Sequence, residues 1–224
     1  MKLSILIPTY NESETILKTI QDVWDSDTGL YEKEIMVIDD GSIDDTKNKL
    51  IRADLPITLI SHQKNYGKGR ALRTGMAYAT GDYIIIQDAD LEYNPREYVK
   101  LLSSLSDNKT VVYGRRSYKQ GYIHYRIGAY LLTLILNILY KTSVHDIYTC
   151  YKLVPTYLLK SLELKSEGFE IEAEITAKIL NRKINIVEVY IEYCPRSFSS
   201  GKKIRALDAW KGLGTIFKIW RNKK

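Results

Sequence analysis

Short apolar runs alternate with stretches of helical periodicity along most of this chain of 224 residues. Runs rich in isoleucine and valine predict strands that are buried on both faces of a sheet. Single helices between successive strands imply right-handed crossovers, and these require a mostly parallel sheet covered by helices on both faces. The alternation therefore predicts an α/β fold. No internal repeat, low-complexity tract or Pro/Gly-rich linker divides the chain.

The pattern places each expected element by residue number. The expected strands are Leu3–Ile7, Glu34–Ile38, Ile57–Ser61, Tyr83–Gln87, Val111–Tyr113 and Val187–Tyr193. The expected helices are Glu14–Trp24, Asp44–Ala53, Lys68–Ala79 and Pro95–Leu105. Ser13 is suited to cap the first helix, and Pro95 suits the first turn of the fourth, where a missing N–H costs nothing.

Composition indicates a globular protein. The chain is 45% hydrophobic and 27% charged, which is far from a disordered composition, and its length can bury a full core as one domain. Cys150 and Cys194 are its only cysteines and do not form a C-x-x-C pair, which argues against a disulfide framework or a zinc knuckle. A reducing cytoplasm is therefore expected. The apolar stretch before Pro8 is too short for a signal peptide and predicts the first strand instead.

Polar segments follow four of the expected strands. They are Pro8–Glu12, Asp39–Asp44, Asn65–Ala71 and Asp88–Asp90. In a parallel sheet, ligands bind beyond the carboxyl ends of the strands, so these segments are expected to meet at one edge. Asp39 and Asp40 could accept hydrogen bonds from ribose hydroxyls or base N–H groups. Gly67 and Gly69 would let the backbone approach a ligand closely, with Lys68 between them.

Asp88 and Asp90 lie one residue apart, directly after the apolar run Tyr83–Ile86. Two carboxylates at the end of a buried strand form a hard oxygen site, which suits Mg²⁺ or Mn²⁺ carrying a diphosphate. Such a charge pair beside the core is costly unless a cation offsets it. The alternative is a surface turn, since Asp is common in turns, and Asp44 could simply cap a helix. The meeting of four polar segments favours the binding interpretation.

Taken together, these motifs resemble the family-2 inverting glycosyltransferases, which have the GT-A fold. The matching segments are Pro8–Glu12, Asp39–Ser42, Asn65–Gly69 and Asp88–Asp90. Within that family the chain looks most like the dolichyl- or polyprenyl-phosphate mannose and glucose synthases. This narrower likeness adds Gly114–Arg116, Asp146, Glu188, Arg196 and Lys202, and the resemblance runs from about residue 3 to 205.

The resemblance implies a role for each matching residue. The nucleotide pocket would be lined by Pro8, Tyr10, Glu12, Ile38 and Asp40. The metal and diphosphate would be held by Asp88, the backbone of Ala89 and Asp90, with Glu92 as a further polar ligand. The acceptor phosphate and donor diphosphate would be gathered by Arg116, Arg196 and Lys202, with Arg126 as a weaker candidate. Arginine suits bidentate phosphate contacts, and lysine acts as a point charge.

The reaction implied is metal-dependent, inverting transfer of a hexose from a nucleotide-sugar to a polyprenyl or dolichyl phosphate. GDP-mannose is the first expectation for the donor and UDP-glucose the second. A phosphate acceptor with a second pKa of about 6 is mostly ionised at neutral pH, so it needs little help from a base. An alcohol acceptor would need a positioned carboxylate, and Asp146 is the candidate; its alternative is a turn or helix cap.

Two other functions compete with this one. The nearer is a glycosyltransferase that acts on a saccharide or other hydroxyl acceptor. The more distant is a nucleic-acid-binding protein without enzymatic activity, which a basic tail could suggest. That reading lacks a recognisable motif and leaves the acidic edge unexplained, so no nucleic-acid partner is expected. Tyr148–Tyr151 stands where relatives have a small Ser/Gly loop, and Lys152 replaces a frequent arginine, which leaves the acceptor open.

Ile127–Tyr140 is uncharged and is flanked by Arg126 and Lys141. At 14 residues it is shorter than the roughly 20 needed to span a bilayer. It could be a buried core helix or a helix in the membrane interface, near residues 126–141, and the resemblance favours the second.

The tail is strongly basic. Nine of the 33 basic residues, but only one of the 27 acids, lie between Arg196 and Lys224. Apolar residues recur at helical spacing: Ile204, Leu207, Trp210, Leu213, Phe217 and Trp220. We therefore expect a catalytic domain over residues 1–203 and a basic amphipathic helix over 204–224. The helix could bind an anionic membrane or pack on the domain, and the expected location is peripheral, at the cytoplasmic face of a membrane.

Overall fold

The computed structural model describes residues 1–117, 123–196 and 206–222. The side chains of residues 123–126, 206 and 207 are outside this description. Two predicted site residues are affected: Lys202 lies outside the described residues, and of Arg126 only the backbone is described.

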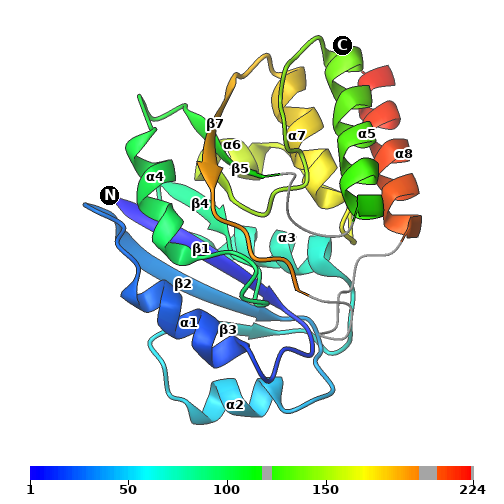
Figure 1. The fold of residues 1–224 in the computed structure, drawn as a ribbon. Coiled ribbons are helices and arrows are strands. Elements are labelled where there is room, and N and C mark those ends of the chain that lie inside the picture. The colour runs from blue at the N-terminus through cyan, green and yellow to red at the C-terminus, as the bar shows by residue number, and fades with distance from the viewer. Residues whose placement is uncertain (118–122, 197–205, 223–224) are drawn as a thin grey trace.

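Seven strands form one sheet in the order β3-β2-β1-β4-β6-β5-β7 (Figure 1). The strands are β1 Lys2–Thr9, β2 Glu32–Asp39, β3 Thr58–Ser61, β4 Tyr83–Ile86, β5 Val111–Arg116, β6 Lys152–Pro155 and β7 Ile186–Ile191. All neighbouring strands run parallel except β6, which is antiparallel to both β4 and β5. The predicted α/β fold with a mostly parallel sheet is therefore confirmed.

Strand β6 was not expected from the sequence. Its four residues are all buried, yet the run carries a lysine and ends in a proline, so it shows neither alternation nor a continuous apolar stretch. Lys152 is tolerated there because its ammonium pairs with the buried carboxylate of Glu172. This ion pair allows the segment to form a buried strand, and local sequence does not reveal it because the two residues are far apart in the chain.

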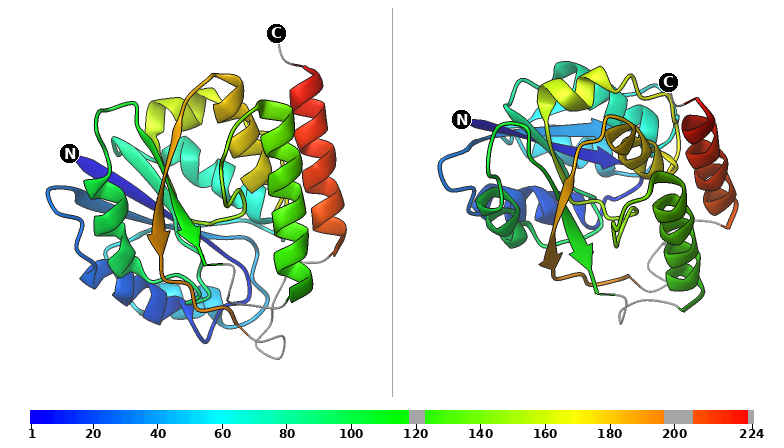
Figure 2. Two further views of the ribbon diagram at one scale, coloured as in Figure 1. Left: turned by 45° about the horizontal axis from the view of Figure 1, so that its top comes forward. Right: turned by 90° about the horizontal axis from the view of Figure 1, so that it is seen from above.

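Helices cover both faces of the sheet. They are α1 Ile16–Asp25, α2 Thr46–Arg52, α3 Lys68–Tyr78, the 3₁₀ helix η1 Pro95–Glu97, α4 Tyr98–Ser103, α5 Ile123–Tyr140, α6 Thr156–Ser161, α7 Ile171–Asn181 and α8 Ala206–Arg221. Seen from above, α3, α6 and α7 lie on one side of the sheet and α1 and α4 on the other (Figure 2). Helices α5 and α8 stand side by side at one end of the molecule.

The start of α1 differs from the prediction. The helix begins at Ile16 with Thr15 as its N-cap residue, and no side chain caps it. The Glu12 carbonyl accepts hydrogen bonds from the backbone N–H groups of both Thr15 and Ile16. Ser13 instead donates its backbone N–H to Asp44, at 3.2 Å. Pro95 does occupy the first position of η1, where Asn94 caps the backbone N–H of Arg96 at 3.1 Å.

Glu34 ties β1, β2 and the loop before β4 together. Its carboxylate accepts hydrogen bonds from the Ser4 hydroxyl at 2.5 Å and from the Thr80 backbone at 2.8 Å, and it pairs with the Lys2 ammonium at 3.1 Å. Burial raises the pKa of Glu34, but the hydrogen bonds from Ser4, Thr80 and Lys2 outweigh it and lower that pKa to about 2. The folded state therefore binds the ionised carboxylate more tightly than water does.

Glu34→Gln should lower the free energy of unfolding by about 2 to 3 kcal/mol at pH 7. Because the pKa is depressed on folding, this stabilisation is complete above the ordinary value near 4.5 and is lost as the pH falls towards 2. Urea unfolding of wild type and variant at pH 7 and pH 3 checks it: the difference should shrink by about half. An unchanged difference would show that ionisation of Glu34 is not the cause.

Candidate active site

Acidic and basic side chains meet at the carboxyl edge of β1, β2 and β4. We call the loops that follow these strands, with the facing segment Tyr193–Arg196, the rim. The Arg196 guanidinium contacts Glu12 at 3.0 Å and Asp90 at 3.1 Å. The Lys68 ammonium contacts Asp88 at 2.7 Å. The structure thus brings together residues that are up to 184 positions apart in the sequence.

The rim carries an excess of negative charge. Burial, together with the charges of Asp88 and Glu92, raises the pKa of Asp90 to about 7, and the opposing charge of Arg196 does not cancel this effect. A site that disfavours its own carboxylate at neutral pH favours a bound cation, and two carboxylates are suitable ligands for Mg²⁺ or Mn²⁺. Among the described residues, no three His, Cys, Asp or Glu side chains form a cluster that could hold a metal. A cation here would need oxygens from its ligand as well.

Both side-chain oxygens of Glu92 accept hydrogen bonds from the protein itself. One of its oxygens accepts the Tyr193 hydroxyl at 2.6 Å, and the other accepts the backbone N–H of Arg196 at 2.8 Å. Its own backbone carbonyl accepts from Cys194 at 2.9 Å. These three contacts fix the segment that carries Arg196, so both oxygens of Glu92 are engaged in holding the arginine at the rim.

The two aspartates after β2 have different surroundings. The buried Asp40 carboxylate accepts hydrogen bonds from the backbone N–H of Gly67 at 2.7 Å and of Tyr66 at 3.0 Å, and it contacts the His62 ring at 2.7 Å. These bonds hold the loop before α3. Asp39 is also buried; one oxygen accepts the Ser42 N–H at 3.1 Å, and the other has no partner among the described residues.

Two further residues predicted for the nucleotide pocket lie on adjacent strands. Pro8 of β1 stands beside Ile38 of β2 in the sheet register. The Ile38 side chain is fully buried, and its Cδ1 lies 2.7 Å from where a Cβ on Gly75 of α3 would be. Ile38 therefore presents no exposed surface to a ligand in this structure. Tyr10 follows β1 and is partly exposed at the rim, and Ala89 is buried between the two aspartates.

Gly67 and Gly69 were predicted to let the backbone approach a ligand. In the structure, both glycines allow close packing against the backbone of another loop. Gly67 has a φ of +101°, and a Cβ there would lie 2.4 Å from the Glu167 carbonyl oxygen. A Cβ on Gly69 would lie 2.5 Å from the Ser166 carbonyl oxygen. Backbone carbonyls of the loop before α7 thus lie against the N-terminus of α3, where the Glu167 carbonyl accepts the Arg70 backbone N–H at 3.1 Å.

Arg116, at the end of β5, forms a bidentate ion pair with Asp146. Its Nε and Nη2 donate to the two carboxylate oxygens at 2.7 and 2.9 Å. Asp146 is 1% exposed and also accepts the backbone N–H of Tyr148 at 3.2 Å. The guanidinium lies over the Tyr193 ring, 5.0 Å from its centroid. Glu188 of β7 holds the backbone N–H of Asp146, so the loop that carries this aspartate is fixed from both sides.

Buried tyrosines support the aspartate pair, a role that sequence reasoning did not assign. The hydroxyls of Tyr98 and Tyr151 each donate to the Gln87 side-chain oxygen at 2.7 Å. The Gln87 amide donates in turn to the Asp88 carbonyl at 3.0 Å. The number of tyrosines in the chain was the available signal, but it says nothing of where they meet.

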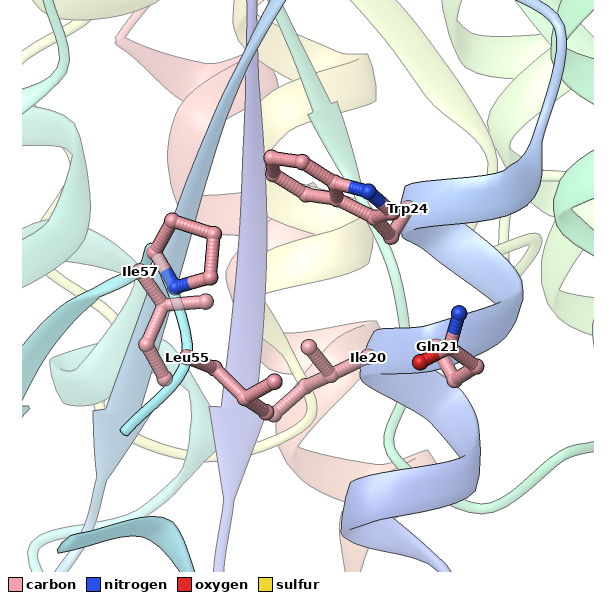
Figure 3. Close-up of a pocket in the computed structure, with 6 residues that line it drawn as sticks. Ile20, Gln21, Trp24, Leu55 and Ile57 are labelled. Atoms are coloured by element: carbon pink, nitrogen blue, oxygen red, sulfur yellow. The ribbon is translucent and has the colours of Figure 1, made fainter. Parts of the chain in front are cut away.

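A hollow elsewhere on the surface is not part of this site. It lies between α1 and the segment before β3, at the amino end of the strands (Figure 3). Its lining is uncharged: Ile20, Gln21, Trp24, Leu55, Pro56 and Ile57. It offers no group suited to a diphosphate.

A mostly parallel sheet with paired aspartates at its carboxyl edge agrees with the resemblance to the GT-A glycosyltransferases. Residues 4–162 match the family described as Glycosyl transferase family 2, which is more than half of the chain. The chain belongs to this family and is a glycosyltransferase. The resemblance noted from its motifs, and the fold that the resemblance implied, are both confirmed.

Relatives of known sequence cover most of the chain. An uncharacterised protein of Methanocaldococcus jannaschii is 30% identical over 83% of this chain and 85% of its own length. A dolichol-phosphate mannosyltransferase of Pyrococcus furiosus is also 30% identical, over 99% of this chain, which spans 62% of that protein. The glycosyltransferase AglJ of Haloferax volcanii is 28% identical over 98% of this chain and 71% of its own.

Solved structures share the fold. Glucosyl-3-phosphoglycerate synthase of Mycobacterium tuberculosis, crystallised with Mn²⁺, UDP and phosphoglyceric acid, superimposes with a TM-score of 0.76. The match covers 98% of this chain and 78% of that one, at 20% identity. At this identity the likeness bears on architecture alone.

Proposed function

We propose that the protein transfers a hexose, with inversion, from a nucleotide-sugar to a polyprenyl or dolichyl phosphate in a reaction that depends on Mg²⁺ or Mn²⁺. The observation that carries the proposal is the assembly of Asp88, Asp90 and Arg196 at one rim with an excess of negative charge. GDP-mannose is the favoured donor, supported by the mannosyltransferase relative of Pyrococcus furiosus, and UDP-glucose is the second.

For the nucleotide, we assign the base or ribose contact to Asp39 rather than Asp40. Asp40 already accepts two backbone hydrogen bonds and contacts His62, whereas Asp39 keeps one buried oxygen without a partner among the described residues. A buried acceptor without a donor is costly, and a hydroxyl or N–H of a nucleotide would satisfy it.

Asp39→Asn should weaken binding of the preferred nucleoside diphosphate about tenfold, because a hydrogen bond to a charged group contributes about 1.5 to 3 kcal/mol. Isothermal titration with GDP and UDP in the presence of Mn²⁺ measures this. Asp27→Asn, at an exposed turn beyond α1, is the matched control and should leave binding unchanged. Equal affinities for wild type and Asp39→Asn would remove Asp39 from the pocket.

In the proposed reaction, a bound divalent cation would stabilise the charge that develops on the leaving nucleoside diphosphate. Arg196 is placed to contact the diphosphate, while Glu12 and Glu92 hold it at the rim. Arg116 would bind the acceptor phosphate, and its pairing with Asp146 sets the plane of its guanidinium. The ionised phosphate oxygen then attacks the anomeric carbon from the face opposite the leaving group.

We propose that Asp146 positions Arg116 instead of acting as a base. Its buried carboxylate already accepts hydrogen bonds from Arg116 and Tyr148, which makes it a poor proton acceptor. An acceptor that is already ionised fits this arrangement better than an alcohol does. Transfer to a saccharide or other hydroxyl remains the competing reaction, and it would require a different base.

Helices α5 and α8 supply a surface for the lipid. None of the helices in the described part of the chain is long and apolar enough to cross a membrane. The inner faces of the pair are packed around Leu136 and Ile216. Large apolar side chains remain exposed on the outer faces: Ile127, Tyr130, Leu131, Leu134, Ile138, Trp210, Phe217 and Trp220. With the exposed Lys211, Lys218 and Arg221, this surface fits a peripheral contact with an anionic membrane.

Trp210→Ala combined with Phe217→Ala should reduce binding to anionic vesicles at least fivefold, because these rings would enter the lipid interface. Co-sedimentation with phosphatidylglycerol vesicles at low salt measures the bound fraction. Trp24→Ala, which removes an exposed tryptophan from α1, is the matched control and should bind like wild type. No binding by the wild type would discard the membrane contact.

The proposed reaction is tested by incubating the protein with GDP-mannose or UDP-glucose, polyprenyl phosphate in detergent and Mn²⁺. We expect a glycolipid whose mass is that of the acceptor plus one hexose, and no product when EDTA is added. Product formed on a saccharide but not on the lipid phosphate would favour the competing acceptor. An EDTA-resistant rate would contradict the metal.

A further inference from the structure

Four alternating charges run inward from the rim. The Lys68 ammonium lies 2.7 Å from Asp88 and 3.0 Å from Glu172, and the Lys152 ammonium lies 2.5 Å from the other oxygen of Glu172. The side chains of Asp88, Lys68, Glu172 and Lys152 are 24, 11, 4 and 1% exposed, in that order. The line therefore starts at the predicted metal ligand and ends in the core, at the first residue of β6.

Lys68 is charged and held in place. Burial lowers its pKa, but Asp88 and Glu172 raise that pKa well above the ordinary value. Lys68 is the first residue of α3. It directly follows Gly67, whose backbone N–H donates a hydrogen bond to Asp40. The Lys68 ammonium lies closer to Asp88, at 2.7 Å, than to Glu172, at 3.0 Å, so Asp88 is the stronger partner.

One carboxylate oxygen of Asp88, Oδ1, therefore pairs with the Lys68 ammonium. The carboxylate is more exposed than the ammonium that holds it, so the lysine lies on the inner side and the second oxygen is left towards the rim. Orienting a metal ligand through a neighbouring group is a common means of tuning a site. The three acids at the rim, Glu12, Asp88 and Asp90, then face two cations, Arg196 and Lys68, so one negative charge stays in excess.

This balance matters because the two forms of ligand differ in charge. A lone divalent cation is positive, whereas the same cation carrying a nucleoside diphosphate is negative overall. A fixed ammonium beside Asp88 repels the first and attracts the second. Removing it should therefore change the two affinities in opposite directions.

We propose that Lys68 is a positioning residue of the donor site: it orients Asp88 and supplies the positive charge that lets an acidic rim accept the anionic diphosphate of the donor. Glu172 and Lys152 keep the ammonium in that position. The inference rests on the proposed function, because it concerns the same donor site.

The test is Lys68→Met, with Mn²⁺ binding followed by electron paramagnetic resonance and Mn²⁺·GDP and Mn²⁺·UDP binding by calorimetry. We expect the complex that the wild type prefers to bind at least tenfold more weakly, while Mn²⁺ alone binds more tightly. Lys68→Arg, which keeps the charge, should recover part of the loss. Lys18→Met removes an exposed lysine of α1 and should change neither affinity.

Other outcomes overturn the proposal. Equal loss of both affinities, with a lower melting temperature, would show that Lys68 serves the fold alone. No change in either would show that it is a bystander. If the wild type itself binds neither Mn²⁺·GDP nor Mn²⁺·UDP, the proposed function fails, and the inference fails with it.

A second set of variants leaves Lys68 and Asp88 intact. Lys152→Met leaves Glu172 with Lys68 as its remaining ionic partner among the described residues, so it should draw the ammonium from Asp88 and weaken binding of the complex at least threefold. Glu172→Gln added to Lys152→Met removes that competition and should restore binding. A double variant that binds no better than Lys152→Met would contradict the role given to Glu172.

Discussion

Asp88→Ala should reduce hexose transfer by at least about a hundredfold to a thousandfold while leaving the protein folded. Removing one group that stabilises charge in a transition state typically costs this much. Folding should survive because Asp88 is the most exposed member of its charge line, and Lys68 keeps Glu172 as a partner. Transfer assays and thermal unfolding of the same preparation measure both effects.

Asp22→Ala is the matched control, since Asp22 is an aspartate of α1 that pairs with a lysine far from the rim. It should transfer hexose at the wild-type rate. Wild-type turnover by Asp88→Ala would end the metal hypothesis, and loss of the folded state would require Asp88→Asn in its place.

Asp146→Ala should lower the free energy of unfolding by about 3 kcal/mol, because it leaves the Arg116 guanidinium without its bidentate partner in a largely buried position. Urea unfolding measures the loss. The double variant Arg116→Met with Asp146→Leu should recover most of it, since apolar residues of similar volume often replace a buried ion pair without cost. It should not recover transfer.

Comparing single variants separates positioning from base catalysis. If Asp146 acts through Arg116, then Arg116→Met and Asp146→Ala should lose similar amounts of transfer to a lipid phosphate. A much larger loss in Asp146→Ala would assign it a role of its own. Unchanged stability in Asp146→Ala would contradict the structural contribution of the pair.

Periodicity predicted the strands that build the rim because these strands are buried on both faces. β4 is a continuous apolar run, and β1 and β2 each contain a shorter one, Ile5–Ile7 and Ile35–Ile38, with the polar segments directly after them. Parallel topology alone then placed Asp39 and Asp88 on one edge. The sequence pattern did not predict β6, because burial of Lys152 in this strand depends on Glu172. This acid belongs to α7 and lies 20 positions further along the chain.

Long-range pairing is what the sequence did not reveal at the site. Arg196 reaches Asp90 across 106 positions, and its contact with Glu12 turns a predicted pocket residue into a partner of the arginine. The different surroundings of Asp39 and Asp40 also depend on distant residues. The loop before α3 donates the backbone N–H groups of Tyr66 and Gly67 to the carboxylate of Asp40 and not to that of Asp39. Local spacing cannot show which of two adjacent carboxylates the fold uses.

In the proposed mechanism, the aspartate pair of the rim holds a divalent cation together with the diphosphate of the donor. Crystals grown with Mn²⁺ and the preferred nucleoside diphosphate test it directly through the anomalous signal of manganese. We expect one strong peak in contact with an oxygen of Asp88 or Asp90 and with the diphosphate. A nucleotide bound at the rim with no manganese beside either aspartate would contradict it.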